Sequence, residues 1–217
     1  MSKERSGTES LAREFFRNQK KVLDLIRARS DVSGFQPAVH RLFGDKPDRR
    51  KTIKVGSRLF FFSSLAANRV SFLPARWQEE LDKIQAGWPG CENWWAGYPL
   101  ITWIETRASD NGTTELKLNA EVGPVSDYKL RNDIIGSIRS AAAAQGLERI
   151  RFPAGSTDQG RLYSRFFVKN SVTLNDVRKT DQVERKIVHI LNEFGSEFDL
   201  VASVLRQFLT MNVTAPR

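Results

Sequence analysis

The sequence predicts an α+β fold: a mainly antiparallel sheet of about five to six strands packed with helices, with N- and C-terminal helices flanking it. Two neighbouring segments, residues 100–107 and 115–122, alternate apolar and polar side chains as strands do. The turn Ser109-Asp110-Asn111-Gly112 between them is typical of a hairpin. Residues 126–146 follow with apolar side chains at helical spacing. We therefore expect a β-hairpin packed on one long helix at the centre of the domain.

The second strand of this hairpin has the clearest alternation. Its expected core-facing side chains are Leu116, Leu118, Ala120 and Val122. Its expected solvent-facing side chains are Glu115, Lys117, Asn119 and Glu121. Gly123-Pro124 ends the strand, Ser126 or Asp127 can cap the helix that follows, and Gly146 ends that helix.

The chain before the hairpin opens with a basic segment. Residues 1–30 are expected to form a short tail and an amphipathic helix from Thr8 to Arg29. The cations on its polar side include Arg13, Arg17, Lys20, Lys21 and Arg27. Cations along one side of a helix are typical of a solvent-exposed surface, and also of a surface that contacts phosphates. A short helix at 35–43 and a loop at 44–48 are expected next.

Three short strands then lead to the hairpin. Residues 52–55, 59–62 and 69–73 are rich in aromatic and β-branched side chains, which predicts the edge of the sheet. Pro74 can open the next helix at its first turn, and Gly87 can end it. The apolar side chains of that helix are Trp77, Leu81 and Ile84.

The C-terminal part of the chain is expected to add two strands and two helices. Residues 147–152 form a short strand candidate, and residues 162–169 alternate as the last strand. Asp181 and Glu184 have the spacing of a capping box at the start of a helix. Gly195-Ser196 separates that helix from a final one, whose apolar side chains are Phe198, Val201, Leu205 and Phe208.

Composition bounds the class of protein. A chain of 217 residues with 40% hydrophobic content can bury a sizeable core. We expect residues 31–210 to form a single α+β domain between the basic N-terminal segment, 1–30, and a C-terminal tail, 211–217. The sequence has no apolar run of the length that crosses a membrane and no secretory signal, so we expect a cytoplasmic protein without membrane contact.

The residues that hold metals or form disulfides are few. The chain has one cysteine, Cys91, and two histidines, His40 and His189. An intramolecular disulfide is therefore excluded, and no zinc ligand set of the usual residues can be assembled. We expect no cofactor, apart from a Mg²⁺ ion if carboxylates form a site.

Positive charge is concentrated near the N-terminus. Residues 1–58 hold 15 Lys and Arg against 7 Asp and Glu, whereas residues 59–217 hold 19 against 18. Part of this surplus is a cluster after the short helix that includes Arg49, Arg50, Lys51 and Lys54. Such a surplus predicts contact with nucleic-acid phosphates, which confers affinity with little sequence readout.

Aromatic residues crowd the segment from Trp88 to Trp103, among glycines and prolines. It also contains Trp94, Trp95 and Tyr98. These side chains can fold back on the sheet as core, form a stacking platform for bases, or anchor a protein partner. If the segment binds a protein partner, Trp94 and Trp95 are its candidate contacts.

A catalytic alternative rests on Glu105, Glu115 and Lys117. Glu115-Leu116-Lys117 has the spacing of a nuclease strand in which a carboxylate holds Mg²⁺ and a lysine stands near the attacking water. Glu105, on the hairpin partner, would sit diagonal to Glu115. The same pattern is the ordinary outward face of an alternating strand, so we expect ion pairing at the surface and no nuclease chemistry.

Several segments in order resemble the C-terminal half of bacterial PD-(D/E)XK nuclease-superfamily proteins. They are Val70-Ser71-Phe72-Leu73-Pro74-Ala75-Arg76-Trp77, Leu116-Lys117-Leu118-Asn119-Ala120-Glu121-Val122-Gly123-Pro124, Arg131 and Tyr163-Ser164-Arg165-Phe166. The resemblance extends over residues 35–210 and lacks the catalytic half, which lies upstream in those proteins. It implies an accessory domain of nucleic-acid-acting or phage-defence proteins and implies no activity.

Two functional hypotheses follow from the sequence. The first is a non-enzymatic nucleic-acid-binding accessory protein that uses the basic residues named above. The second is a protein-interaction subunit of a separately encoded effector, whose gene we expect nearby. The sequence gives no prediction of oligomeric state.

Overall fold

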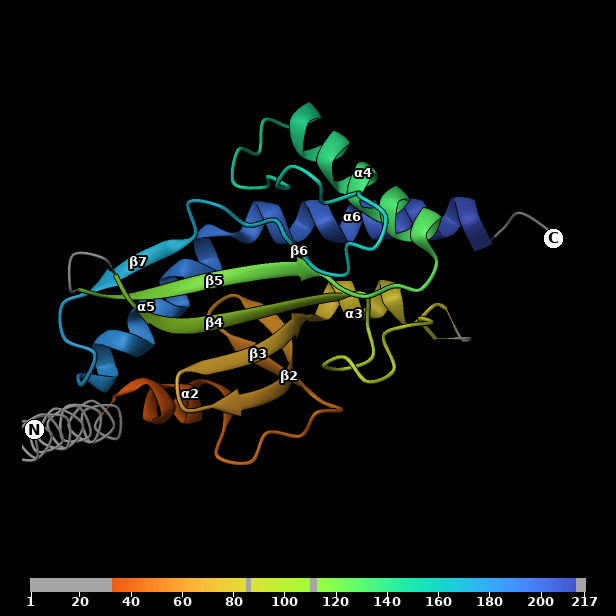
Figure 1. Ribbon diagram of the computed structural model, residues 1–217. Helices are drawn as coiled ribbons and strands as arrows, with labels where there is room; N and C mark the ends of the chain where they lie inside the picture. Colours follow the sequence, from red (N-terminus) through yellow and green to blue (C-terminus); the bar gives the residue numbers. More distant parts are fainter. Residues whose placement is uncertain (1–32, 85–86, 110–112, 214–217) are drawn as a thin grey trace, which may run out of the picture.

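A computed structural model describes residues 33–84, 87–109 and 113–213 of the 217-residue chain. Within these residues the fold is α+β, as predicted: one antiparallel sheet carries helices α5 and α6 behind it in Figure 1, and α4 lies at the top of that view. The amphipathic helix predicted at Thr8–Arg29 lies outside the described residues.

The sheet is built from seven strands in the order β1-β2-β3-β4-β5-β6, and β7 also pairs with β5. Their bounds are β1 Thr52–Val55, β2 Arg58–Ala66, β3 Arg69–Pro74, β4 Leu100–Ala108, β5 Thr114–Val122, β6 Ser164–Arg165 and β7 Ser171–Leu174. All of the pairings are antiparallel. The connections between neighbouring strands are short for β1 to β3, so this half of the sheet is a meander.

Five helices are described. They are α2 Phe35–Phe43, α3 Ala75–Leu81, α4 Tyr128–Ala144, α5 Thr180–Glu193 and α6 Gly195–Val213. Predicted and observed bounds agree for α2, and Asp127 caps α4 as expected, because its carboxylate accepts a hydrogen bond from the backbone N–H of Leu130 at 3.0 Å. Helix α3 ends at Leu81, earlier than the predicted stop at Gly87. Helix α6 continues to Val213, beyond the predicted start of the tail.

The central hairpin forms as predicted. Arg107 pairs with Glu115 and Leu100 with Val122 across β4 and β5. The four predicted core side chains of β5 are all fully buried. They face a core that also contains Phe60, Phe72, Phe166 and Phe198. One prediction for this strand was wrong, since Asn119 is buried on the opposite side of the sheet.

The predicted strand at 162–169 was wrong in its length and its alternation. Only Ser164–Arg165 pairs as β6, and Phe166 and Phe167 are both buried in succession, which an alternating strand does not allow. Lys169 then adopts φ +50°, a left-handed conformation that redirects the chain into β7. The two short strands β6 and β7 therefore share one edge of β5.

Two smaller predictions also need correction. Residues 147–152 form no strand, and contribute one bridge between Ile150 and Phe167. The capping box is absent, since α5 begins at Thr180 and no side chain caps it. Asp181 and Glu184 instead bind the guanidinium of Arg41, which ties α5 to α2. Of the described helices, none is both long and apolar enough to cross a membrane.

Candidate functional site

The sheet has a second face, opposite the core, which we call the outer face. Cross-strand partners share a face of a sheet, so the pairings of Ser71 with Trp103 and of Trp103 with Asn119 place these three side chains together on it. The next row towards the β4–β5 turn is Arg69, Glu105 and Lys117. Lys54 and Phe61 extend this face to β1 and β2.

The aromatic segment, residues 88–99, folds against the sheet and is held by close backbone contacts. Gly123 donates a hydrogen bond to the carbonyl of Pro99 at 2.8 Å, and Ser126 donates one to the carbonyl of Pro89 at 2.8 Å. Gly90 has φ +93°, and a Cβ there would lie 2.2 Å from the carbonyl oxygen of Pro124. Glycine is therefore required at this approach. Trp88 is buried and donates to the carbonyl of Leu81 at 3.2 Å.

Trp95 links this segment to the outer face. Its ring lies nearly parallel to that of Trp103, with centroids 6.3 Å apart and an angle of 13° between the planes. The guanidinium of Arg69 lies 4.7 Å from the centroid of the Trp95 ring, and that of Arg165 lies 4.9 Å from the centroid of Trp103. Each indole thus has a cation over its face, an arrangement that stabilises both partners. Trp103 is buried, whereas Trp94 and Trp95 are half-buried.

A cavity of about 520 Å³ opens beside Trp95, and we call it the aromatic cavity. Its apolar wall comes from the sheet and comprises Phe61, Phe62, Leu73, Leu100 and Ile101. Trp95, Ala96 and Tyr98 of the aromatic segment line it from one side, and Gln78 and Asp82 come from α3 and the turn after it. Ser63, Arg49 and Arg50 complete the lining.

The tertiary structure therefore joins two predicted features that are far apart in the sequence. Arg49 and Arg50 belong to the predicted phosphate-binding cluster, and Trp95 was a candidate protein contact, yet all three line one cavity. Lys51 and Lys54 of the same cluster are exposed on the adjoining turn and strand. Arg50 also pairs with Asp48, whose carboxylate accepts its backbone N–H at 2.9 Å. The remaining five predicted cations, at positions 13–27, lie outside the described residues.

One acidic group stands at this cavity. Asp82 accepts a hydrogen bond from the hydroxyl of Tyr98. Burial, and then this bond and the charge of Asp82, raise the pKa of the Tyr98 hydroxyl well above its ordinary value. Tyr98 therefore stays protonated and donates to Asp82 at all physiological pH values. Asp82 and Gln78 were not identified from the sequence, because nothing in the spacing of residues 75–82 relates them to the aromatic segment.

Two polar atoms beneath the aromatic segment lack partners. The Ser71 hydroxyl oxygen and the Trp103 indole nitrogen are buried, and neither has a hydrogen-bond partner among the described residues. An unpaired buried polar group costs about 1–3 kcal/mol. Trp95, which covers Trp103, also has φ +50°, a backbone conformation that bulky residues rarely adopt. Strained backbone and unpaired polar atoms concentrate at functional sites.

The residues of the nuclease alternative lie on the outer face in the predicted register. Lys117 stands opposite Glu105, and Arg107 stands opposite Glu115, so the two carboxylates are diagonal to each other as expected. Glu105 accepts a hydrogen bond from the Asn119 amide at 3.3 Å. Within the described residues no group of three or more His, Cys, Asp or Glu side chains could hold a metal ion.

Cys91 belongs to the aromatic segment and is fully buried. Burial, with a smaller contribution from the charge of Glu92, raises the pKa of its thiol to about 11. The thiol is protonated at neutral pH and lacks the thiolate that nucleophilic chemistry needs.

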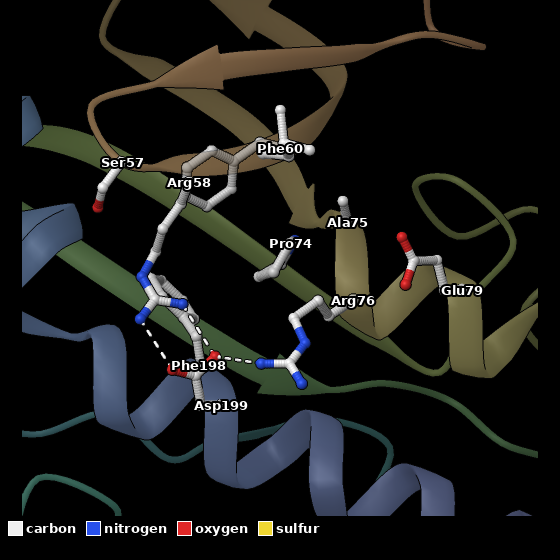
Figure 2. A pocket seen from close by; sticks show the side chains of 10 residues that line it. Ser57, Arg58, Phe60, Pro74, Ala75, Arg76, Glu79, Phe198 and Asp199 are labelled. Carbon is white, nitrogen blue, oxygen red and sulfur yellow. Dashed lines mark hydrogen bonds and ion pairs between the residues drawn. The ribbon is translucent and has the colours of Figure 1, made fainter.

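A second, smaller cavity of about 360 Å³ lies where β2, α3 and α6 meet (Figure 2). Arg58 donates two hydrogen bonds to the carboxylate of Asp199, at 3.0 and 2.9 Å, and Arg76 donates one at 3.0 Å. The bonds from Arg58 lower the pKa of Asp199 against the opposing effect of burial. Figure 2 shows both guanidinium groups directed at Asp199, with Glu79 apart from them. The rings of Phe60 and Phe198, with centroids 6.0 Å apart, line the same cavity.

Comparisons with known proteins give no relative: no protein family, no curated protein and no solved structure matches this chain. The resemblance to PD-(D/E)XK proteins stays a prediction. The geometry of the aromatic cavity and its arginines therefore carries the functional argument.

Proposed function

We propose that this protein is a non-enzymatic nucleic-acid-binding module whose phosphate contacts come from the basic cluster Arg49, Arg50, Lys51 and Lys54. The observation that carries the proposal is the position of Arg49 and Arg50 at a cavity lined by Trp95 and Tyr98. Arginine and lysine supply affinity for phosphates, and aromatic rings that line a cavity beside them give bases a surface on which to stack.

The placement of charge supports this proposal. All four residues of the basic cluster are exposed, and they lie together on the turn before β1 and on β1 itself. Asp48 neutralises part of the charge of Arg50, and Asp82 adds one negative charge at the cavity. The other five cations of the prediction, at positions 13–27, lie outside the described residues, so the proposal rests on the basic cluster alone.

The test measures binding of a fluorescently labelled oligonucleotide to the full chain across a range of salt concentrations. We expect the logarithm of the association constant to fall linearly with the logarithm of salt concentration. A triple variant that carries Arg49→Glu, Arg50→Glu and Lys51→Glu should bind more than about tenfold more weakly. The slope of the logarithm of its association constant against the logarithm of salt concentration should be smaller in magnitude by about 2 to 3.

The matched control reverses three exposed cations elsewhere: Lys129→Glu, Arg151→Glu and Arg185→Glu. It changes the net charge by the same amount, and α4, which carries Lys129, lies on the opposite side of the molecule from residues 44–51 (Figure 1). The proposal requires the control to bind nearly as the parent does. A flat salt response, or equal loss in the two triple variants, would contradict it.

The same preparations decide the nuclease alternative. Supercoiled plasmid is incubated with the protein and Mg²⁺ or Mn²⁺, and the products are separated on a gel. Our proposal expects no nicking that depends on the metal. Cleavage that is abolished by Lys117→Ala and by Glu115→Gln would replace the binding module with a metal-dependent enzyme.

A further inference from the structure

The geometry points to a single-stranded ligand: we infer that one unpaired nucleobase enters the aromatic cavity while Arg49 and Arg50 hold its phosphates. This inference rests on the proposed function and adds the class of nucleic acid that the site takes. Its evidence is the composition of the cavity, the backbone of Trp95 and the unpaired polar atoms beneath it.

The composition of the cavity matches a whole nucleotide better than it matches a base alone or a phosphate alone. Phe61, Trp95 and Tyr98 offer ring surfaces, and the two arginines offer charge for an anion. A planar apolar ring joined to an anionic group is the chemistry of a nucleotide. Gln78 and Asp82 add a carboxamide and a carboxylate, which can pair with the polar edge of a base.

Duplex nucleic acid does not satisfy this site. Its bases are stacked on each other and paired along their edges, so none can enter a cavity without being extruded, which costs energy. In a single strand the bases are free to leave the stack. A groove that combines cations with aromatic side chains is the common solution for binding such strands.

Trp95 is the side chain most suited to respond to the base. Its backbone is in the left-handed region at φ +50°, and its ring covers Trp103, whose indole N–H has no acceptor within the described residues. The Ser71 hydroxyl beside Trp103 is unpaired in the same way. Neither Ser71 nor Trp103 lines the aromatic cavity itself, so a shift of Trp95 on ligand binding would release the strained backbone and uncover Trp103.

The test compares three ligands of equal length: a single strand, its duplex, and a single strand made of abasic sites, which keeps the phosphates and lacks the bases. Stacking of one base is worth roughly tenfold in affinity, within a range of about 5- to 150-fold. We expect the single strand to bind about tenfold more tightly than the other two. A strand with a central 2-aminopurine should lose fluorescence when it binds, because the base stacks on aromatic rings.

Two variants of the aromatic segment distinguish the effect of blocking the cavity from the effect of added negative charge. Ala96→Glu places a side chain at the lining, whereas Asn93→Glu adds the same charge in the same segment at an exposed position outside the lining. Ala96→Glu should remove the preference for the single strand and the 2-aminopurine quenching. Asn93→Glu should retain both. Circular dichroism melting curves of both variants check that the fold is kept.

The outcomes distinguish the inference from the proposed function. Equal, salt-dependent binding of single strand, duplex and abasic strand would overturn the inference and leave the proposed function standing. Equal weakening by the two variants would also overturn it, since charge alone would then explain the effect. Absence of salt-dependent binding to all three ligands would overturn the proposed function and the inference together.

Discussion

The indole of Trp94 lies directly on Gly123: a Cβ added at Gly123 would lie 2.2 Å from Cζ3 of that ring. This contact fixes the aromatic segment to the end of β5, and the ring of Tyr163 meets Trp94 from another side with centroids 6.0 Å apart. Trp94 is therefore a packing residue of the segment that lines the aromatic cavity. Its role in binding a protein partner stays a prediction.

Gly123→Ala should displace Trp94 and destabilise the fold, because a ring that is already in contact with the backbone cannot make room for a methyl group. Overpacking of this kind costs about 1–3 kcal/mol. The matched control is Gly136→Ala in α4, where the added methyl group meets nothing within 4 Å. Alanine there should stabilise the protein by about 0.5–1 kcal/mol. Chemical denaturation measures both free energies of unfolding, and a neutral Gly123→Ala variant would contradict the packing role of Trp94.

Asp199→Asn should lower stability by about 1 kcal/mol at pH 7, a modest value because 43% of the Asp199 side chain is exposed to water. The pKa of this carboxyl is lower in the folded protein than its ordinary 3.8. Its stabilising effect is therefore complete above pH 3.8 and is lost as pH falls through the folded pKa. Denaturation of parent and variant from pH 7 to pH 2 should show their stabilities converging at the acid end. The exposed Asp133→Asn is the control, and a difference between parent and Asp199→Asn that stays constant from pH 7 to pH 2 would count against the Arg58–Asp199 pair.

Arg131→Met should destabilise the protein by about 3–5 kcal/mol, because it leaves several buried acceptors without a donor. The guanidinium donates to the carbonyl of Gly123 at 3.1 Å, to the carbonyl of Ser156 at 2.8 Å and to the hydroxyl of Ser164 at 2.8 Å. Burial lowers the pKa of Arg131, yet arginine remains charged at neutral pH. Arg139→Met, which removes a single hydrogen bond to Ser156 from a more exposed residue, should cost about 1 kcal/mol or less. Similar losses in the two variants would refute the special role of the buried network.

Cys91 should not react with a thiol reagent in the folded protein at pH 7 to 8, since it is buried and its thiol pKa is raised to about 11. In denaturant the same reagent should titrate one thiol per chain, because Cys91 is the only cysteine. Spectrophotometric thiol titration with and without denaturant makes the comparison. Rapid labelling without denaturant would show that the aromatic segment opens easily from the sheet.

The alternation of apolar side chains predicted strand β5 correctly but predicted residues 162–169 wrongly. Alternation along β5 predicted its four core side chains correctly, because a strand paired on both sides has a period of two and buries one face. The same reasoning was wrong at 162–169, where Phe166 and Phe167 are both buried. Lys169 takes a left-handed conformation that the composition does not predict. This conformation allows the chain to leave β6 and begin β7.

Local signals also failed where a distant residue competed for the same groups. Asp181 and Glu184 have the spacing of a capping box, but the structure pairs both with Arg41 of α2. Asn119 was expected to face solvent with its neighbours on β5, yet it lies beside Trp103, and Trp103 beside Ser71, in a buried row of the outer face. Periodicity identifies the two faces of a strand, but it does not reveal what covers the second one.

By itself the sequence determined the α+β class, the central hairpin and its helix, the concentration of positive charge near the N-terminus, and the crowding of aromatic residues between Trp88 and Trp103. These features are local, since they depend on spacing, turn chemistry and composition over a few residues. Only the tertiary structure decided that Arg49 and Arg50 share a cavity with Trp95, and that Asp82 and Gln78 join them. Residues separated by tens of positions meet there because the strands between them pair and the aromatic segment folds back on the sheet, and these long-range contacts leave no pattern in the sequence of either partner.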